Sequence, residues 1–209
     1  MFKRILTILS LSLLSFTAVA EEYEAGTHYD VINPAIRTAD PAKIEAAEFF
    51  WYGCGHCYNF EPMLAQWKKT LDEDVNFRGI PAMWGGAMEL HAKAYYAARV
   101  LKVEDKMDQA IFQALNVDRN PLRSEKEIAE LFVANGIEEA DFYKAFNSFG
   151  VGSQVRQANS TARAAKITGT PSMMINGKYL ITSRKAGGNA GMLKVADFLI
   201  AKERAAKGS

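Results

Sequence analysis

The stretch 44–57 reads IEAAEFFWYGCGHC and decides the fold. As far as Tyr52 it is apolar except for two glutamates, which is typical of a strand buried in the centre of a sheet. Cys54 and Cys57 follow directly, with two residues between them. In the stretch 58–71 the apolar side chains then have helical spacing. A strand, a C-x-x-C pair and a helix in this order favour a thiol–disulfide redox motif.

The two cysteines are the only ones in the chain. A bridge that closes so short a loop removes little chain entropy, so Cys54 and Cys57 are poorly explained as a structural staple. A zinc site would need two further ligands, and no second pair of cysteines or histidines supplies them. His28 and His91 lie far away in the sequence and are interpreted as ordinary surface or core residues. We therefore expect a redox-active disulfide that uses no metal and no other cofactor.

The position of the pair at the start of a helix predicts two unequal thiols. The first turn of a helix presents free N–H groups and the positive end of the helix dipole, which would lower the pKa of Cys54. His56, if protonated or donating a hydrogen bond, acts in the same direction. Cys57 lies one turn further along and should be more buried. Cys54 is thus the predicted nucleophile and Cys57 the resolving thiol, and a stable Cys54 thiolate is a good leaving group.

The order of the remaining elements predicts an α/β protein. Strands are predicted at residues 29–32, 44–52, 75–82, 172–175 and 179–182, and Asn176-Gly177 between the last two is a strong hairpin signal. Further helices are predicted at residues 86–101, 103–115, 124–135, 138–147, 155–167 and 192–206, with a break at Gly150 and Gly152. A βαβ half and a ββα half separated by a block of helices is the thioredoxin fold with an inserted all-helical subdomain.

The first twenty residues have the layout of a secretory signal peptide. Lys3 and Arg4 precede a short apolar run, and Ala18-Val19-Ala20 is typical of a signal peptidase site. The run is too short for a membrane anchor, which needs ~20 apolar residues. The predicted product is therefore exported to the periplasm and is not embedded in the membrane. We divide the chain into the signal (1–20), a first thioredoxin-fold part (21–83), the inserted helical subdomain (84–158) and a second thioredoxin-fold part (159–209).

The charge of the chain is nearly balanced. Its formal net charge is +1, from 25 Lys and Arg against 24 Asp and Glu, and removal of the signal peptide makes it slightly acidic. A nucleic-acid-binding protein would show a basic excess, so that class is excluded. A polybasic protein of the membrane surface is excluded for the same reason.

Several motifs in combination resemble a known family. The run from Phe50 to Cys57, with a proline five residues later, resembles the thioredoxin superfamily, and Gly169-Thr170-Pro171 resembles its cis-proline loop. Over nearly the full mature length the chain resembles the DsbA family of bacterial periplasmic oxidases. Besides the helical insert, the features that carry this resemblance are Glu48-Phe49-Phe50, Cys57-Tyr58-Asn59-Phe60-Glu61, Asn147-Ser148-Phe149 and Ile175-Asn176-Gly177-Lys178-Tyr179.

The resemblance implies a function and two kinds of partner. A member of this family donates disulfides to reduced, newly exported proteins and is reoxidised by a quinone-linked membrane partner of the DsbB type. The chain is expected to act as a monomer. One departure concerns the dipeptide between the cysteines, which is usually Pro-His in the family and is Gly55-His56 here, as in eukaryotic disulfide isomerases. Because this dipeptide tunes the redox potential, the oxidising strength stays open.

Three more residues are assigned catalytic roles. Pro171 is predicted to be cis and to face the cysteines; the alternative is an ordinary loop proline. Glu48 is predicted to relay a proton to or from Cys57, because an unpaired carboxylate in an apolar strand is costly; the alternative is a solvated residue at the sheet edge. Glu61 lies one turn past Cys57 and is predicted to cooperate, with an exposed position on the helix as the alternative.

Substrate binding is assigned to Gly55, Thr170 and Trp51. Thr170 directly precedes Pro171 and should touch the substrate or Cys54. Trp51 could line an apolar substrate groove, and its alternative role is core packing.

The sequence leaves three alternatives to the oxidase function. The first is an isomerase or reductase of the same fold, although dedicated bacterial isomerases resemble thioredoxin domains joined to a dimerisation domain. This chain leaves no room for such a domain before its first strand. The second is a non-catalytic binding or chaperone module, against which the intact pair Cys54 and Cys57 argues. The third, a glutathione-linked enzyme with a similar helical insert, fits poorly with an export signal.

Overall fold

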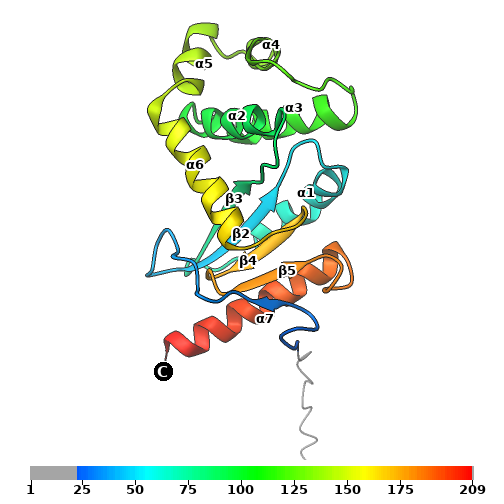
Figure 1. Ribbon diagram of the computed structural model, residues 1–209, viewed down its shortest axis with the longest axis vertical. Helices are drawn as coiled ribbons and strands as arrows, with labels where there is room; N and C mark the ends of the chain where they lie inside the picture. Colours follow the sequence, from blue (N-terminus) through cyan, green and yellow to red (C-terminus); the bar gives the residue numbers. More distant parts are fainter. Residues whose placement is uncertain (1–22, 209) are drawn as a thin grey trace, which may run out of the picture.

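The computed structural model describes residues 23–208 of the chain (Figure 1). The predicted signal peptide, residues 1–20, lies outside the described residues. Within the described part, no helix is both long and apolar enough to cross a bilayer. The helices are α1 (Gly55–Lys68), α2 (Met88–Val100), α3 (Glu104–Asn116), α4 (Glu125–Ala134), α5 (Glu139–Phe146), α6 (Phe149–Ala164) and α7 (Asn189–Lys207).

A mixed sheet of five strands occupies the lower half of the molecule in Figure 1. The strands are β1 (Asp30–Val31), β2 (Ile44–Phe50), β3 (Val75–Pro81), β4 (Ser172–Ile175) and β5 (Tyr179–Thr182), in the spatial order β1-β5-β4-β2-β3. β3 runs parallel to β2, and the other neighbouring pairs are antiparallel. All seven residues of β2 are buried, which confirms the prediction of a central strand before the cysteines.

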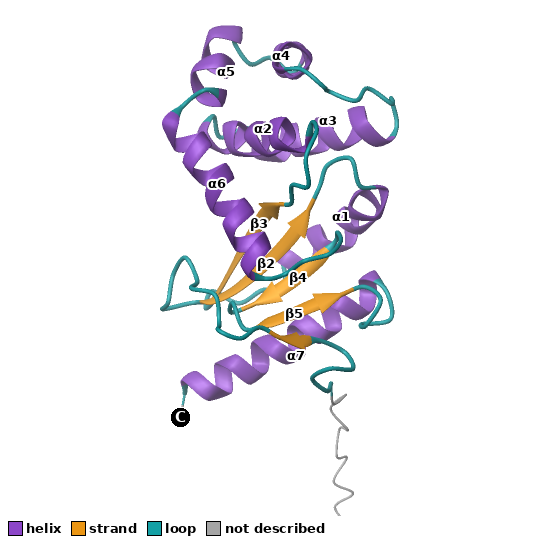
Figure 2. Cartoon of the chain, viewed as in Figure 1, coloured by secondary structure: helices purple, strands orange, loops and turns teal. Residues whose placement is uncertain are grey.

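Helices cover both faces of the sheet. α1 and α7 share an apolar core with one face, to which Phe60 and Leu199 contribute. α6 packs on the opposite face through Ala158 and Ala162. Figures 1 and 2 accordingly show α6 passing in front of the sheet and α7 behind it. This arrangement confirms the predicted thioredoxin fold.

The inserted helices α2 to α5 form a second layer beyond the upper ends of β2 and β3 (Figure 2). Their core contains side chains from several helices, including Phe132 and Phe142. The same core includes Phe50, Tyr52 and Cys57. The helical layer is therefore packed directly against the segment that carries the cysteines.

The starts of α1 and α6 differ from the predicted starts for identifiable physical reasons. α1 begins at Gly55 rather than at residue 58, because the C-x-x-C pair itself forms the first helical turn, and it continues through Pro62. The predicted break at Gly150 and Gly152 is wrong, since α6 begins at Phe149 and runs through both glycines. The N-terminus of α6 is capped by the Ser148 hydroxyl, which accepts a hydrogen bond from the Val151 N–H at 3.2 Å. Capping and burial of the following apolar face outweigh the low helix propensity of the two glycines.

α6 also crosses residue 158, at which the predicted helical subdomain ends. Its N-terminal Val151 packs with Ala92 of α2, and its later Ala162 packs on the sheet. The helix thereby joins the two layers of the molecule. The division at residues 83 and 158 stays a prediction.

The hairpin turn at Asn176-Gly177 gives a test of the fold. Both residues have positive φ, and a Cβ added to Gly177 would lie 1.9 Å from the backbone oxygen of Ile36. We expect Gly177→Ala to lower the free energy of unfolding by about 3 kcal/mol, because strain at positive φ adds to a clash between two backbones. Gly187→Ala is the matched control, since Gly187 also has positive φ but nothing within 4 Å of its Cβ position. Its expected loss is about 1 kcal/mol. Equal losses in urea unfolding would show that the close approach to Ile36 is unimportant.

Candidate redox site

The two cysteines lie at the junction between β2 and α1. Cys54 is the N-cap residue of α1, in an extended conformation and without a side-chain cap. Its N–H donates to the Trp51 carbonyl at 2.9 Å, and its own carbonyl accepts from the Tyr58 N–H at 3.0 Å. The first N–H groups of α1 are consequently free to face the Cys54 sulfur.

Cys54 is a partly exposed free thiol with a strongly lowered pKa. Hydrogen bonding from the Cys57 thiol is the largest cause, and the Thr170 side chain and the backbone N–H groups of Cys57 and His56 act in the same direction. Partial burial opposes them, and the resulting pKa is about 5. The Cys54 thiolate is thus the predominant form at neutral pH.

Cys57 has the opposite character. Its side chain is 0% exposed. Its pKa is raised far above the usual range, because it donates its hydrogen bond to Cys54, because it is buried, and because Glu48 is near. The pair therefore consists of one accessible thiolate and one buried thiol, as predicted from the helix position.

Among the residues that the structure describes, the His56 side chain makes no contact with either cysteine that would stabilise a thiolate. It is exposed, and in residues 23–208 its imidazole makes no hydrogen bond or ring contact. The influence of His56 on Cys54 comes through its backbone N–H. The proposed role of the imidazole stays a prediction.

The segment before β4 faces Cys54 from across the site. The Thr170–Pro171 peptide bond is cis, as predicted, and Asn33–Pro34 is a second cis bond that the sequence analysis did not expect. The Cys54 sulfur lies 3.4 Å from the Thr170 carbonyl oxygen. Residues 116 positions apart in the sequence are thereby brought into contact.

Glu48 lies in the central strand and not at an edge, so its alternative interpretation is wrong. Its side chain is buried, and its Oε1 has no hydrogen-bond partner in the described structure. Burial raises the pKa of Glu48, and the negative charge of Glu61 raises it further. Glu61 is itself half-buried, and burial raises its pKa as well. Both carboxyl groups line a cavity of about 430 Å³, together with Lys68 and Arg99.

In residues 23–208 no group of three or more His, Cys, Asp or Glu side chains is placed to hold a metal ion.

Comparison with known proteins agrees with this geometry. A sequence model of the DsbA-like thioredoxin domain matches residues 46–199. The thiol:disulfide interchange protein DsbA of Azotobacter vinelandii is 41% identical over 186 residues, which cover 89% of this chain and 87% of that protein. The Pseudomonas aeruginosa protein of the same name is 37% identical over 195 residues, or 93% and 92% of the two chains. The chain belongs to the DsbA-like thioredoxin domain family.

Solved structures lead to the same family. The crystal structure of Pseudomonas aeruginosa DsbA aligns with a TM-score of 0.86 at 37% sequence identity, covering 90% of this chain and 97% of that one. The DsbA oxidoreductase of Xylella fastidiosa aligns with a TM-score of 0.81 at 30% identity, covering 88% and 98%. This DsbA-like protein is a thiol:disulfide oxidoreductase.

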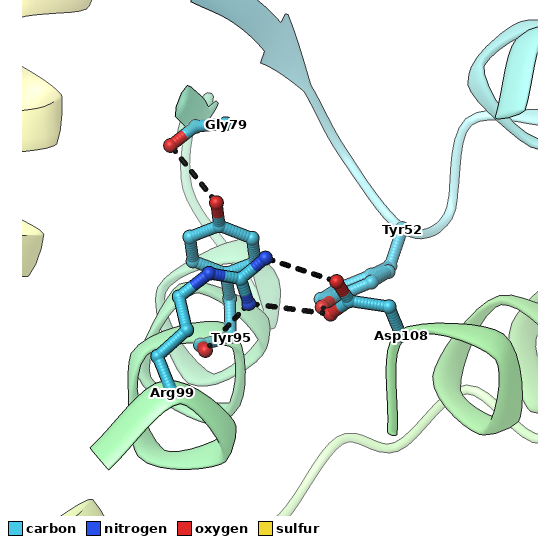
Figure 3. A network of polar contacts seen from close by, with 5 residues as sticks. All are labelled: Tyr52, Gly79, Tyr95, Arg99 and Asp108. Carbon is cyan, nitrogen blue, oxygen red and sulfur yellow. Dashed lines mark hydrogen bonds and ion pairs between the residues drawn. The ribbon is translucent and has the colours of Figure 1, made fainter. Parts of the chain in front are cut away.

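A polar network that the sequence analysis missed ties the redox loop of the DsbA-like protein to its helical layer (Figure 3). The Tyr52 hydroxyl donates to Asp108 of α3, and Arg99 of α2 forms an ion pair with the same carboxylate at 2.9 Å. The Arg99 guanidinium lies 3.1 Å from the ring centroid of Tyr95, whose hydroxyl donates to the Gly79 carbonyl at 3.1 Å. The partners are up to 56 positions apart, so no local pattern could have indicated them.

Trp51 is held by a second unpredicted contact. Its indole N–H donates to Nδ1 of His91 at 3.0 Å, and Nε2 of His91 lies 3.1 Å from the Leu122 carbonyl. This geometry requires the neutral imidazole with its proton on Nε2, and burial lowers the pKa of His91. The Trp51 ring also covers Gly53, where a Cβ would lie 2.4 Å from it. His91 is therefore a core residue, as expected, but one that fixes the orientation of Trp51 next to Cys54.

The source of the Cys54 acidity can be tested by removing side chains. His56→Ala should raise the pKa of Cys54 by less than about one unit, because the backbone N–H of residue 56 is retained. Thr170→Val removes a hydroxyl with little change of size, and it should raise the pKa of Cys54 more than His56→Ala does. The measurement is a pH titration of the ultraviolet absorbance of the thiolate. A rise of several units in His56→Ala would make the imidazole, and not the Cys57 thiol and the backbone amides, the main stabiliser of the thiolate.

Proposed function

We propose that this DsbA-like protein is a periplasmic oxidase that donates its Cys54–Cys57 disulfide to reduced, newly exported proteins. The observation that carries the proposal is the contrast between the two thiols. A thiolate with a pKa near 5 at Cys54 stabilises the reduced enzyme, so the oxidised enzyme gives up its disulfide readily.

The first step is attack of a substrate thiolate on the Cys54 sulfur of the oxidised enzyme. A substrate–Cys54 mixed disulfide forms, the Cys54–Cys57 bond breaks, and its electron pair leaves on Cys57. Because the pKa of Cys57 is raised far above the usual range, this sulfur takes up a proton at once. Glu48 is the proposed donor, since burial raises its pKa and thereby favours its protonated form, and Glu61 would return the proton from the cavity that both line.

The second step releases the product. A second substrate thiolate attacks the substrate sulfur of the mixed disulfide, and Cys54 leaves as a thiolate. The substrate has then lost two electrons and the enzyme holds two reduced cysteines. The amides of the first turn of α1 receive the developing charge on Cys54.

The segment around Pro171 would hold the substrate during both steps. Thr170 already contacts the Cys54 sulfur through its carbonyl group, so a peptide bound at Cys54 passes along this segment. Trp51 and the exposed Gly55 border the same site on the side of α1. These contacts support the assignment of Thr170, Trp51 and Gly55 to substrate binding.

Recycling and location complete the proposal. The enzyme would be exported by residues 1–20, act as a monomer in the periplasm, and be reoxidised by a quinone-linked membrane partner of the DsbB type. An isomerase or reductase is the alternative, and Gly55 favours it because it resembles the isomerase dipeptide. Equilibration with glutathione separates the two, since an oxidase requires a much less negative potential than a reductase.

Trapping experiments test the roles of the two cysteines. Cys57→Ala should accumulate mixed disulfides with proteins that already contain a disulfide: the Cys54 thiolate attacks one sulfur, the other sulfur leaves as a thiolate, and the resolving thiol that would release the adduct is missing. Cys54→Ala should lose oxidase activity and trap nothing, because the remaining thiol is buried. Mass spectrometry of the adducts identifies the linked residue. Adducts through Cys57 in Cys54→Ala would reverse the assignment, and an insulin-reduction assay without activity in the wild type would leave only a binding module.

The pH dependence of stability tests the same charge. A thiol with a folded pKa near 5 and an ordinary unfolded pKa of ~8.5 stabilises the folded state fully above the higher value and loses this effect as pH falls through the lower one. The oxidised protein lacks this group and serves as the baseline. We expect the reduced form to melt above the oxidised form at pH 7, with a difference in Tm that grows by roughly 10 °C from about pH 5 to about pH 8. A difference that does not change with pH would contradict the low pKa of Cys54.

A further inference from the structure

A groove of about 690 Å³ lies beside α6, on the face of the sheet opposite α1 and α7. Val155, Ala162 and Ile167 contribute buried apolar side chains to its floor. At its rim Trp84 is 55% exposed. A large aromatic side chain left this open beside an apolar floor is a common feature of surfaces that bind other chains.

Both walls of the groove lead to the redox site. One wall begins at Met83, directly after Ala82, whose N–H donates to the Phe50 carbonyl at 2.8 Å. It therefore starts beside the loop that carries Cys54. The other wall contains Ile167, three residues before Thr170, which contacts Cys54. Ile167 to Thr170 is a stretch of four residues, and four extended residues span at most ~14 Å. A peptide linked to Cys54 therefore reaches the groove within about five residues.

The rim of the groove is basic. Arg156 and Arg163 of α6 and Lys166 after it are all exposed, against a single acidic residue, Glu89. Within residues 23–208, none of the three cations forms an ion pair with a carboxylate; Arg156 lies over the Phe149 ring, with 5.7 Å from guanidinium to centroid. Three unpaired cations along a groove in a chain of nearly balanced charge favour an acidic ligand.

We propose that this groove binds the segment of the substrate polypeptide that flanks the reacting cysteine, and that it selects segments carrying acidic side chains. Arg156, Arg163 and Lys166 would pair with the carboxylates, and Trp84 would cover an apolar side chain between them. The inference rests on the proposed oxidase function and adds a substrate preference to it. A polypeptide is the favoured occupant because Met83 and Ile167, which line the groove, lie within a few residues of segments that contact the redox loop.

The test compares three dithiol peptides that differ only in the residues flanking their two cysteines, which are glutamate, glutamine or lysine. Each is oxidised by the disulfide form of the full protein, and dithiothreitol is oxidised in parallel as a small substrate that cannot reach the groove. We expect the glutamate peptide to react with a kcat/KM about tenfold above that of the lysine peptide, through KM and not kcat. Added salt should reduce this ratio, because the charges are exposed.

Charge reversal on α6 identifies the surface. In the double variant Arg156→Glu and Arg163→Glu the order of the glutamate and lysine peptides should invert, while the rate with dithiothreitol stays unchanged. The matched control is Arg123→Glu with Lys144→Glu, which makes the same change of net charge at exposed positions of the helical layer. It should keep the wild-type order. Trp84→Ala should lower kcat/KM for all three peptides to a similar extent.

The outcomes separate this inference from the function on which it rests. No oxidation of dithiothreitol or any peptide by the wild type would overturn the oxidase itself. Normal oxidation of dithiothreitol with equal rates for the three peptides, or equal effects of the α6 and control variants, would overturn the groove alone. Loss of binding to vesicles of phosphatidylglycerol and phosphatidylethanolamine in the α6 variant, without any change in peptide preference, would assign the basic rim to a membrane surface instead.

Discussion

The negative charge held on the Cys54 sulfur is the interaction on which the rest of the structure depends. A thiolate at a helix N-terminus is stabilised only if the first N–H groups remain uncapped and the sulfur stays accessible to another protein. Cys54 meets both conditions because it is itself the N-cap residue and provides no competing side-chain cap. The same charge makes Cys54 a good leaving group, and we expect it to make the reduced protein more stable than the oxidised one. Chemistry and stability then have one origin.

The asymmetry between the cysteines places a demand on the surrounding core. Cys57 must be fully buried only three residues after an accessible sulfur, and the thioredoxin fold has its helices on the two faces of the sheet and not beyond this end of it. The inserted helices bury Cys57 there, since their apolar core includes Cys57, Tyr52 and Phe50. The Tyr52–Asp108–Arg99 network then fixes the redox loop against α2 and α3 (Figure 3). Burying Glu48 without a partner is costly for folding, and such a cost is typical of a functional site.

The parts of the structure that the sequence predicted are those with local causes. The buried strand, the C-x-x-C pair and the helix that follows are encoded within one continuous stretch, residues 44–71. The start of the helix predicted at residues 124–135 also has a local cause, because the Ser124 hydroxyl accepts from the N–H three residues later. Contacts between distant positions had no such signal, as for His91 with Trp51 and Asp108 with Tyr52. Gly150 and Gly152 of α6 are the opposite case. Their low helix propensity predicted a break, but tertiary packing outweighs that local preference.

This division between local and distant causes also separates the chemistry of the protein from its recognition of substrates. The pKa of Cys54 is determined mainly by groups within three residues of it, with Thr170 as the one distant contribution among its principal causes. The surfaces next to it come from elsewhere: the segment after β3, and α6, which links the helical layer to the sheet. Substitutions on the exposed side of α6 can therefore change which polypeptides approach Cys54 without altering the groups that set its acidity. The Cys54 thiolate tolerates such changes, because the Cys57 thiol, the Thr170 side chain and the backbone amides that stabilise it are all retained when residues of α6 are replaced.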